Sequence, residues 1–240
     1  MDEYVKIAFS YNGREQRMIL PRLLHMIPIA HNMHFKTIEF ILSVAKKNNR
    51  EIKYIVDVGA SIGAWTVAYS FIFPDAEILA IEPSKYNMLF LEHNCKDLNS
   101  TKLLKLIMHD EKDSVRIAAP TPLQRPDVPI DRPESGLISV YGTSEHYAEL
   151  VDADTLDNVV EKRVDWLKID VEGHEMPVLN GAERILKEDR PVLQIEIRDI
   201  NQAMAGGTSW KLLQYITARK YCMVGDMRGD LVFVPNERMK

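Results

Sequence analysis

The chain has 240 residues, of which 46% are hydrophobic and 27% are charged. This is enough for one sizeable α/β domain with a continuous core, expected over 51–240 after an N-terminal extension at 1–50. The net charge of −5, without a lysine or arginine block, disfavours a nucleic-acid partner. The two distant cysteines and the polar N-terminus predict neither a disulfide framework nor a leader or membrane span, so a cytoplasmic location is expected.

The N-terminal extension is expected to hold a hairpin and a helix. Residues 4–11 and 14–20 flank Asn12-Gly13, the dipeptide that best suits a two-residue type I′ turn. Apolar residues recur at helical spacing over 35–47, which predicts a helix that covers the sheet or the cofactor cleft, with the sheet favoured.

A glycine loop follows the first strand of the main domain. Residues 52–58 are short, β-branched and apolar, as expected for a central parallel strand. Gly59 and Gly63 allow a tight turn and close backbone approach, and the helix expected from Ala64 to Phe73 offers free N–H groups at its start. The loop can therefore hold a polar or carboxylate-like group.

The spacing of the glycines bears on which cofactor this loop holds. A dinucleotide fingerprint requires glycines at 59, 61 and about 64, where this chain has Gly59, Ser61 and Ala64, so NAD is disfavoured. Glu82 ends the next apolar strand, 77–82, about 20 residues beyond the loop, where an acid can accept from both ribose hydroxyls. The alternative is a solvated acid at the end of a strand.

The following segments continue the alternation of helices and strands. Residues 86–98 predict a helix, and 102–108 predict a third strand that leads to His109 and Asp110. This order is typical of a doubly wound, mostly parallel sheet. His109 can equally be a core or a surface histidine.

An insertion loop is expected at about 120–150. Five prolines within 120–133 rule out an ordinary helix or central strand there. A loop of this kind is either a substrate lid or a mobile connection. As a lid, it would bring Arg125, Arg132 and Tyr141 to a sugar, phosphate or carboxylate group.

A second group of acids follows the strand expected over 164–170. Asp170 ends this strand at the edge where open α/β sheets bind ligands, and Glu172, His174 and Glu175 come directly after it. The alternative is that these acids only stabilise the start of a helix over 176–187.

Two motifs resemble a known family. The segment Asp57-Val58-Gly59-Ala60-Ser61-Ile62-Gly63 and the pair Glu82-Pro83 resemble the first motif and second-strand acid of class I S-adenosylmethionine-dependent methyltransferases. Residues 167–175 (LKIDVEGHE), with 178–182 (VLNGA), are similar to the signature of FkbM-type methyltransferases. The resemblance covers about residues 52–200. It implies a Rossmann-like sheet of seven strands and S-adenosylmethionine as the cofactor.

The resemblance also implies roles for individual residues. At the end of the third strand it makes Asp110 a candidate for the adenine amino group, and Trp65 is placed to touch the cofactor. The expected cofactor-binding residues are Asp57, Gly59, Ala60, Ser61, Gly63, Trp65, Glu82, Pro83, Asp110 and Asp170.

The chemistry of methyl transfer requires mainly in-line positioning, because the leaving group departs as a neutral thioether. A hydroxyl acceptor also benefits from a base, for which Glu172 and His174 are nearly equal candidates. Asp170 would orient the methionine amine or the acceptor hydroxyl. We expect no metal; a less favoured alternative joins Asp170, Glu172 and His174 to Asp110 or Glu196 around a divalent cation.

The C-terminal segments complete the expected fold and function. Residues 191–197 predict a fifth parallel strand, 209–219 a helix, and 221–226 with 230–234 an antiparallel hairpin. The expected activity is O-methylation of a sugar, glycolipid or small natural product, and a homo-oligomer is one of the states left open. A non-catalytic cofactor- or partner-binding domain and an NAD-dependent oxidoreductase remain alternatives.

Overall fold

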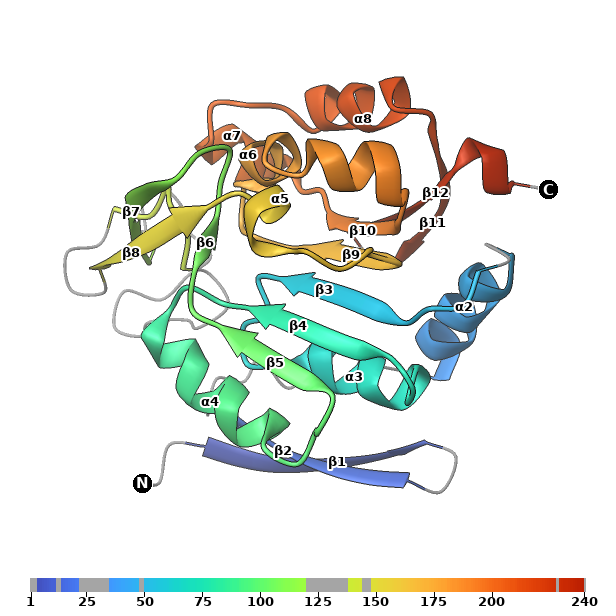
Figure 1. The fold of residues 1–240 in the computed structure, drawn as a ribbon. Coiled ribbons are helices and arrows are strands. Elements are labelled where there is room, and N and C mark those ends of the chain that lie inside the picture. Colours follow the sequence, from blue (N-terminus) through green and yellow to red (C-terminus); the bar gives the residue numbers. More distant parts are fainter. Residues whose placement is uncertain are drawn as a thin grey trace.

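The structure, a computed structural model, describes residues 4–11, 14–21, 35–47, 50–119, 138–143, 148–227 and 229–239. Its centre is a seven-stranded sheet in the order β11-β12-β10-β9-β3-β4-β5 (Figure 1). The strands are β3 (Tyr54–Val58), β4 (Glu77–Ile81), β5 (Thr101–Leu104), β9 (Trp166–Ile169), β10 (Val192–Glu196), β11 (Tyr221–Met227) and β12 (Asp230–Pro235). Neighbours from β5 to β10 pair in parallel, while β12 pairs antiparallel with β10 and β11. The doubly wound sheet expected from the sequence is confirmed.

Side chains of the central strands alternate between two apolar layers. In β3, Val56 and Val58 join one core cluster, whereas Ile55 joins the other. Because both faces are covered, the strand is apolar throughout except at Asp57, and all three of these apolar residues are at most 2% exposed.

Helices cover both faces of the sheet (Figure 1). On one face, α6 (Glu175–Asn180) and α8 (Ser209–Ala218) contribute Val178, Leu179, Leu212 and Ile216 to the core. The other face carries α2 (Phe35–Lys47), α3 (Ala64–Ile72) and α4 (Lys85–Cys95). The expectation that the helix at 35–47 covers the sheet is borne out, since Ile38, Ile41 and Val44 pack against it.

The third strand is shorter than the sequence indicates. Instead of 102–108, β5 ends at Leu104, where its partner β4 also ends at Ile81. The chain then turns, and β6 (Ile107–Met108) pairs with Ala153 and Asp154 of a separate sheet. That sheet has the order β6-β8-β7 and lies beside the carboxyl ends of the parallel strands (Figure 1). Its other strands are β7 (Asp113–Ala118) and β8 (Ala148–Asp154).

The helix expected over 176–187 is also interrupted. Helix α6 ends at Asn180, and a π-helical turn follows at Ile185–Asp189. A Cβ atom on Gly181 would lie 2.0 Å from the carbonyl oxygen of His109, so the chain packs closely here because the side chain is absent. The carboxylate of Asp157, in the short helix α5 (Leu156–Val159), accepts from the N–H groups of Arg184 and Ile185.

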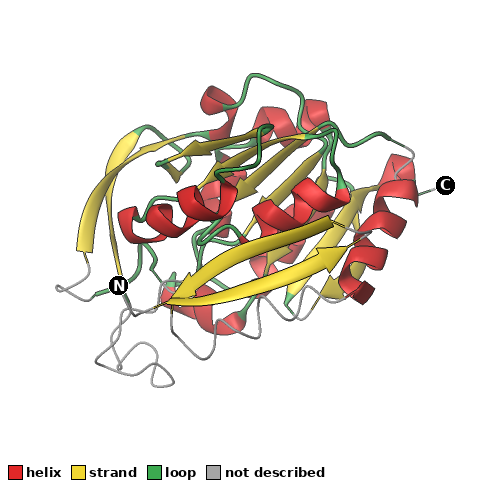
Figure 2. Cartoon of the chain, turned by 90° about the horizontal axis from the view of Figure 1, so that it is seen from below, coloured by secondary structure: helices red, strands yellow, loops and turns green. Residues whose placement is uncertain are grey.

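The expected N-terminal hairpin is present as β1 (Tyr4–Tyr11) and β2 (Arg14–Pro21), paired from Tyr4 with Pro21 to Tyr11 with Arg14. Its turn dipeptide lies outside the described residues. The hairpin lies across the outside of the helical layer that contains α4 (Figure 2). Asn94 of α4 attaches it: Oδ1 accepts from Ile19 N at 2.8 Å, and Nδ2 donates to the carbonyl oxygens of Ile19 and Ile62.

The proline-rich part of the insertion, with Arg125 and Arg132, lies outside the described residues, so the lid hypothesis is untested. The division of the chain near residue 50 also stays a prediction. Within the described ranges, no helix has the length and apolar character needed to cross a bilayer.

We predict that Asn94→Ala destabilises the fold by about 1–3 kcal/mol, because it leaves partly buried backbone groups of β2 and a buried carbonyl of the glycine loop without a partner. Denaturant unfolding measures the change. Asn99→Ala, at an exposed position near the end of the same helix, is the control and should stay within about 0.5 kcal/mol of the parent. Equal stabilities for the two variants would contradict this role of Asn94.

Candidate functional site: the carboxyl edge of the sheet

The glycine loop after β3 is held tightly against β4 and β9. The N–H groups of Gly59 and Ala60 both donate to the carbonyl oxygen of Ile81, at 2.9 and 3.0 Å. Gly59 has φ +74°, and a Cβ there would lie 1.7 Å from the carbonyl oxygen of Asp170. Only glycine fits this position, because both the backbone angle and the contact exclude a side chain.

Glu82 lies beneath this loop and is 5% exposed. Its carboxylate accepts from Ser61 N at 2.8 Å, Ser84 N at 3.0 Å and Asn87 Nδ2 at 3.1 Å. Burial raises the pKa of Glu82 to about 7, against the lowering effect of these donors. The buried Oγ of Ser61 has no hydrogen-bond partner among the described residues. An acid and a free hydroxyl side by side suit a ligand that carries hydroxyl groups.

Asp57 is fully buried and does not reach the surface of the loop. In the register of the sheet, Asp57 is paired with Lys168 of β9, and Lys168 is paired with Gln194 of β10. Thr66 Oγ1 donates to Asp57 Oδ2 at 2.6 Å, and Lys168 Nζ lies 3.2 Å from Asp57 Oδ1. Asp57 therefore supports the loop indirectly, through its contacts with Thr66 and Lys168.

Lys168 connects this buried row to the site. Its ammonium group, 2% exposed, also lies 3.3 Å from the carbonyl oxygen of Gly59 and 3.5 Å from Asp170 Oδ2. Burial alone would lower the pKa of Lys168, but the carboxylates of Asp57, Asp170 and Asp230 raise it above its ordinary value. The lysine is thus charged, and it joins the glycine loop to the end of β9.

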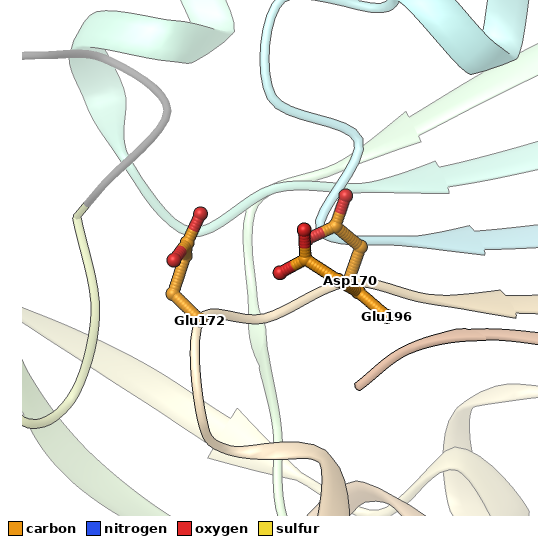
Figure 3. Close-up of side chains that lie close together, drawn as sticks. All are labelled: Asp170, Glu172 and Glu196. Atoms are coloured by element: carbon orange, nitrogen blue, oxygen red, sulfur yellow. The ribbon is translucent and has the colours of Figure 1, made fainter. Parts of the chain in front are cut away.

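Three carboxylates, those of Asp170, Glu172 and Glu196, meet at this edge, with oxygen atoms within 4.8 Å of one another (Figure 3). Asn201 Nδ2 donates to Glu172 at 2.9 Å and to Glu196 at 3.1 Å, and Arg198 Nε lies 2.6 Å from Glu196 Oε1. Burial, followed by the carboxylates of Asp170 and Glu172, raises the pKa of Glu196 to about 10. Arg198 and Asn201 offset part of this effect by their contacts with Glu196.

His174 is buried, at 5% exposure, and both of its ring nitrogens have partners. Nδ1 lies 3.1 Å from Tyr141 Oη, and Nε2 lies 3.2 Å from His109 Nδ1. Burial, followed by the neighbouring His109, lowers the pKa of His174 to about 4. The side chain of Glu172 is likewise engaged, by Asn201. Both ring nitrogens of His174 are thus engaged, and the roles of Glu172 and His174 as bases stay predictions.

The remaining expected site residues have varied surroundings. Ala60 is buried and Pro83 is half-buried beside the loop, and Gly63, at φ +90°, precedes α3. The Trp65 ring stacks on Tyr69 at 5.5 Å between ring centroids. Asp110 pairs with His109, at 3.0 Å from Nδ1. The expected cofactor contacts of Trp65 and Asp110 stay predictions.

Several residues of this site have no role among the predictions from sequence. Lys168 lies within the family signature at 167–175, and a lysine in the apolar run Trp166–Ile169 is a signal of a buried counter-ion. Thr66, Arg198 and Asn201 carry no comparable signal, because their positions depend on how helices and strands pack.

The sheet order, the glycine loop and the acid at the end of the second strand define a class I methyltransferase fold. The model of the family described as "Methyltransferase FkbM domain" matches residues 57–222, more than two thirds of the chain. The chain belongs to the FkbM methyltransferase domain family. The resemblance inferred from residues 167–175 is thereby confirmed.

Solved structures of methyltransferases are similar to this chain. A methyltransferase FkbM from Methylobacillus flagellatus KT superposes with a TM-score of 0.52 at 20% identity, over 77% of this chain and 44% of that one. A putative caffeoyl-CoA O-methyltransferase from Staphylococcus aureus gives 0.48 at 13% identity, over 84% of each chain. This chain thus aligns with less than half of the M. flagellatus protein. No curated protein sequence matches it.

Membership of this family makes S-adenosylmethionine the cofactor. The chain's own residues fit it: the loop from Gly59 to Gly63 offers close backbone approach, and Glu82 with the unpartnered Ser61 hydroxyl offers partners for ribose. When bound, the cofactor would supply a methyl group on a sulfonium, and the end of β9 lies against the loop at Gly59.

We predict that Lys168→Met lowers stability by about 3–5 kcal/mol, because it leaves the buried carboxylate of Asp57 without its counter-ion. The double variant Lys168→Met/Asp57→Asn removes both charges and should recover most of that loss. Denaturant unfolding of the parent and the variants, including Asp57→Asn alone, gives the coupling free energy. Stabilities that simply add would show that the two side chains do not depend on each other.

We also predict that the affinity for S-adenosylhomocysteine rises with pH up to about 7 and then levels off. Ribose hydroxyls that donate to Glu82 favour its charged form, so the complex binds fewer protons than the free protein, in which this pKa is about 7. Calorimetry at pH 6, in buffers of different ionisation enthalpy, should detect proton release.

Glu82→Gln should lose this proton release, and Glu82→Ala should bind more weakly at every pH. Burial also raises the pKa of Asp230, to about 6, so release that persists in Glu82→Gln would come from another group. Unchanged affinity in Glu82→Ala would overturn the ribose assignment.

Proposed function

We propose that this chain is an S-adenosylmethionine-dependent O-methyltransferase whose acceptor is a hydroxyl of a sugar, glycolipid or small natural product. The family match supports methyl transfer in general, and the edge of the sheet supports a hydroxyl acceptor. The observation that carries the proposal is the meeting of Asp170, Glu172 and Glu196 beside the glycine loop.

Carboxyl groups at this edge suit an acceptor with several hydroxyls. Ionised carboxylates accept hydrogen bonds and do not donate them, so they select for ligands with O–H groups. Asp170 stands nearest to the glycine loop, through its backbone contact with Gly59 and its ion pair with Lys168. We assign Asp170 the role of orienting the cofactor amine or the acceptor hydroxyl.

The reaction requires that the acceptor be held in line with the methyl group. A rigid carboxyl edge serves this purpose, because positioning alone can supply several kcal/mol of the barrier reduction, on the order of 7–11 in favourable model reactions. The turn at 170–175 is rigid because Glu175, 1% exposed, accepts from the N–H groups of Val171 and Gly173 and from the amide of Gln202.

The cytoplasmic location expected from the sequence stays a prediction.

The first experiment compares binding with turnover. Calorimetry with S-adenosylmethionine, S-adenosylhomocysteine and NAD should give micromolar binding of the two sulfur nucleotides and none of NAD. A panel of glycosides, glycolipids, phenols and aliphatic alcohols is then tested for formation of S-adenosylhomocysteine, with and without magnesium, and for the methyl ether product by mass spectrometry.

Amine analogues of the turned-over acceptors are the matched controls and should react more slowly. Preferred methylation of the amines would contradict the O-methyltransferase assignment. Binding of S-adenosylmethionine without turnover of any panel member would favour a non-catalytic, partner-binding domain, and binding of NAD alone would favour an oxidoreductase.

A further inference from the structure

A line of hydrogen-bonding side chains connects three separate segments of the chain. Tyr141, from the described part of the insertion, has its Oη 3.1 Å from His174 Nδ1. His174, directly before α6, has its Nε2 3.2 Å from His109 Nδ1. The same Nδ1 atom lies 3.0 Å from Asp110 Oδ1. The four residues therefore form a continuous series that ends in a histidine–carboxylate pair.

This series lies over the edge that holds the cofactor loop. His174 follows β9, and His109 follows β6, which the chain enters directly from β5. In the sheet, β3 and β4 stand between β9 and β5, and these two strands end in the glycine loop and in Glu82. Contact between the two histidines thus joins the segments on either side of the cofactor edge.

The shared Nδ1 atom determines where the protons lie. A bare Nδ1 on His109 would place its lone pair against the carboxylate of Asp110, whereas a protonated Nδ1 donates to that carboxylate and to His174 Nε2 together. His174 Nε2 must then be the acceptor. Because burial keeps His174 neutral, its own proton lies on Nδ1 and is donated to Tyr141 Oη.

The other ring nitrogen of His109, Nε2, is left as a proton acceptor. With Nδ1 protonated, neutral His109 carries a lone pair on Nε2, and the described residues provide no hydrogen-bond partner for that atom. The side chain of His109 is 18% exposed, whereas His174 is nearly fully buried. Of the two histidines, His109 is therefore the one that a substrate can reach.

We propose that His109 is the general base of the methyl transfer, and that Asp110, His174 and Tyr141 are positioning residues that hold its Nε2 ready to accept a proton. This inference rests on the proposed function, and it replaces Glu172 and His174 as candidate bases.

The methyl transfer conserves both protons and charge. The acceptor hydroxyl gives its proton to His109 Nε2 as its oxygen bonds to the methyl carbon, and the carbon–sulfur electron pair stays on sulfur as a neutral thioether. The imidazolium so formed donates from Nδ1 to Asp110, which offsets its charge. Release of the Nε2 proton to solvent restores the neutral ring.

The groups around His109 favour this behaviour. Asp110 contributes a negative charge from the same segment, and the neutral His174 lies directly before α6. Burial, together with the negative charges of Glu175 and Asp110, raises the pKa of Tyr141. Tyr141 therefore keeps its proton at neutral pH.

The first test is nuclear magnetic resonance of the full chain with ¹⁵N-labelled histidine rings, with and without S-adenosylhomocysteine. Spectra of His109→Gln and His174→Gln assign the two rings. We expect neutral His109 to carry its proton on Nδ1, and His174 to stay neutral from about pH 5.5 to 8, in keeping with its pKa of about 4. A proton on Nε2 of neutral His109, or protonation of His174 within this range, would overturn the proposal.

The second test measures turnover on a hydroxyl acceptor found in the panel above. His109→Gln should lower kcat by about 10²- to 10⁴-fold, the usual loss of a general base, with the Kd of S-adenosylhomocysteine changed less than about twofold. Asp110→Asn should lower kcat and weaken the preference of neutral His109 for the Nδ1 proton in the spectra, because an amide oxygen is a weaker acceptor than a carboxylate. Tyr141→Phe should alter the His174 tautomer in the spectra.

His93→Gln, at an exposed position on α4, is the matched control and should leave turnover unchanged. A His109→Gln enzyme with kcat within threefold of the parent would sink the assignment of the base while leaving the methyltransferase intact. Failure of the parent to bind S-adenosylhomocysteine or to form methyl ethers would instead count against the proposed function, whatever the tautomers.

Discussion

The buried ion pair between Lys168 and Asp57 is the interaction on which the rest of the site depends. Both side chains lie within the sheet, at 2% and 0% exposure, where an unpaired charge would cost several kcal/mol. The pair is tolerable because the two residues stand level on adjacent parallel strands and Thr66 adds a hydrogen bond. The same ammonium group lies near the Gly59 carbonyl and Asp170. One buried charge thereby joins the glycine loop to the carboxyl end of β9.

The histidine series shows how the additions to the sheet complete the site. β6 leaves the direction of β5 to join the three-stranded sheet, and this brings His109 across to His174. Close packing of Gly181 on the His109 carbonyl keeps that segment in place. The insertion contributes Tyr141 to the same series. In the site that we propose, elements outside the seven-stranded sheet therefore shape the acceptor side, while the parallel strands shape the cofactor side.

Local patterns predicted most elements because each lies within one run of sequence. The helix at Phe35–Lys47 and the paired strands of the N-terminal hairpin agree with expectation almost to the residue. The prediction failed where a run of apolar residues served two sheets, as in 102–108, and where a helix was interrupted at Gly181. In both cases pairing or packing with distant residues, Ala153 and His109, overrode a continuous local pattern.

By itself, the sequence determined the class of fold, the glycine loop, Glu82 and the family signature, because each is carried by residues close together in the chain. Tertiary structure alone decided which charges meet. Asp57 and Lys168 are more than a hundred positions apart and share a row only through the order of the sheet. The burial of His174 and the approach of His109 depend likewise on contacts between distant segments. The chemistry of a titratable group depends on its neighbours, and these neighbours are set by packing.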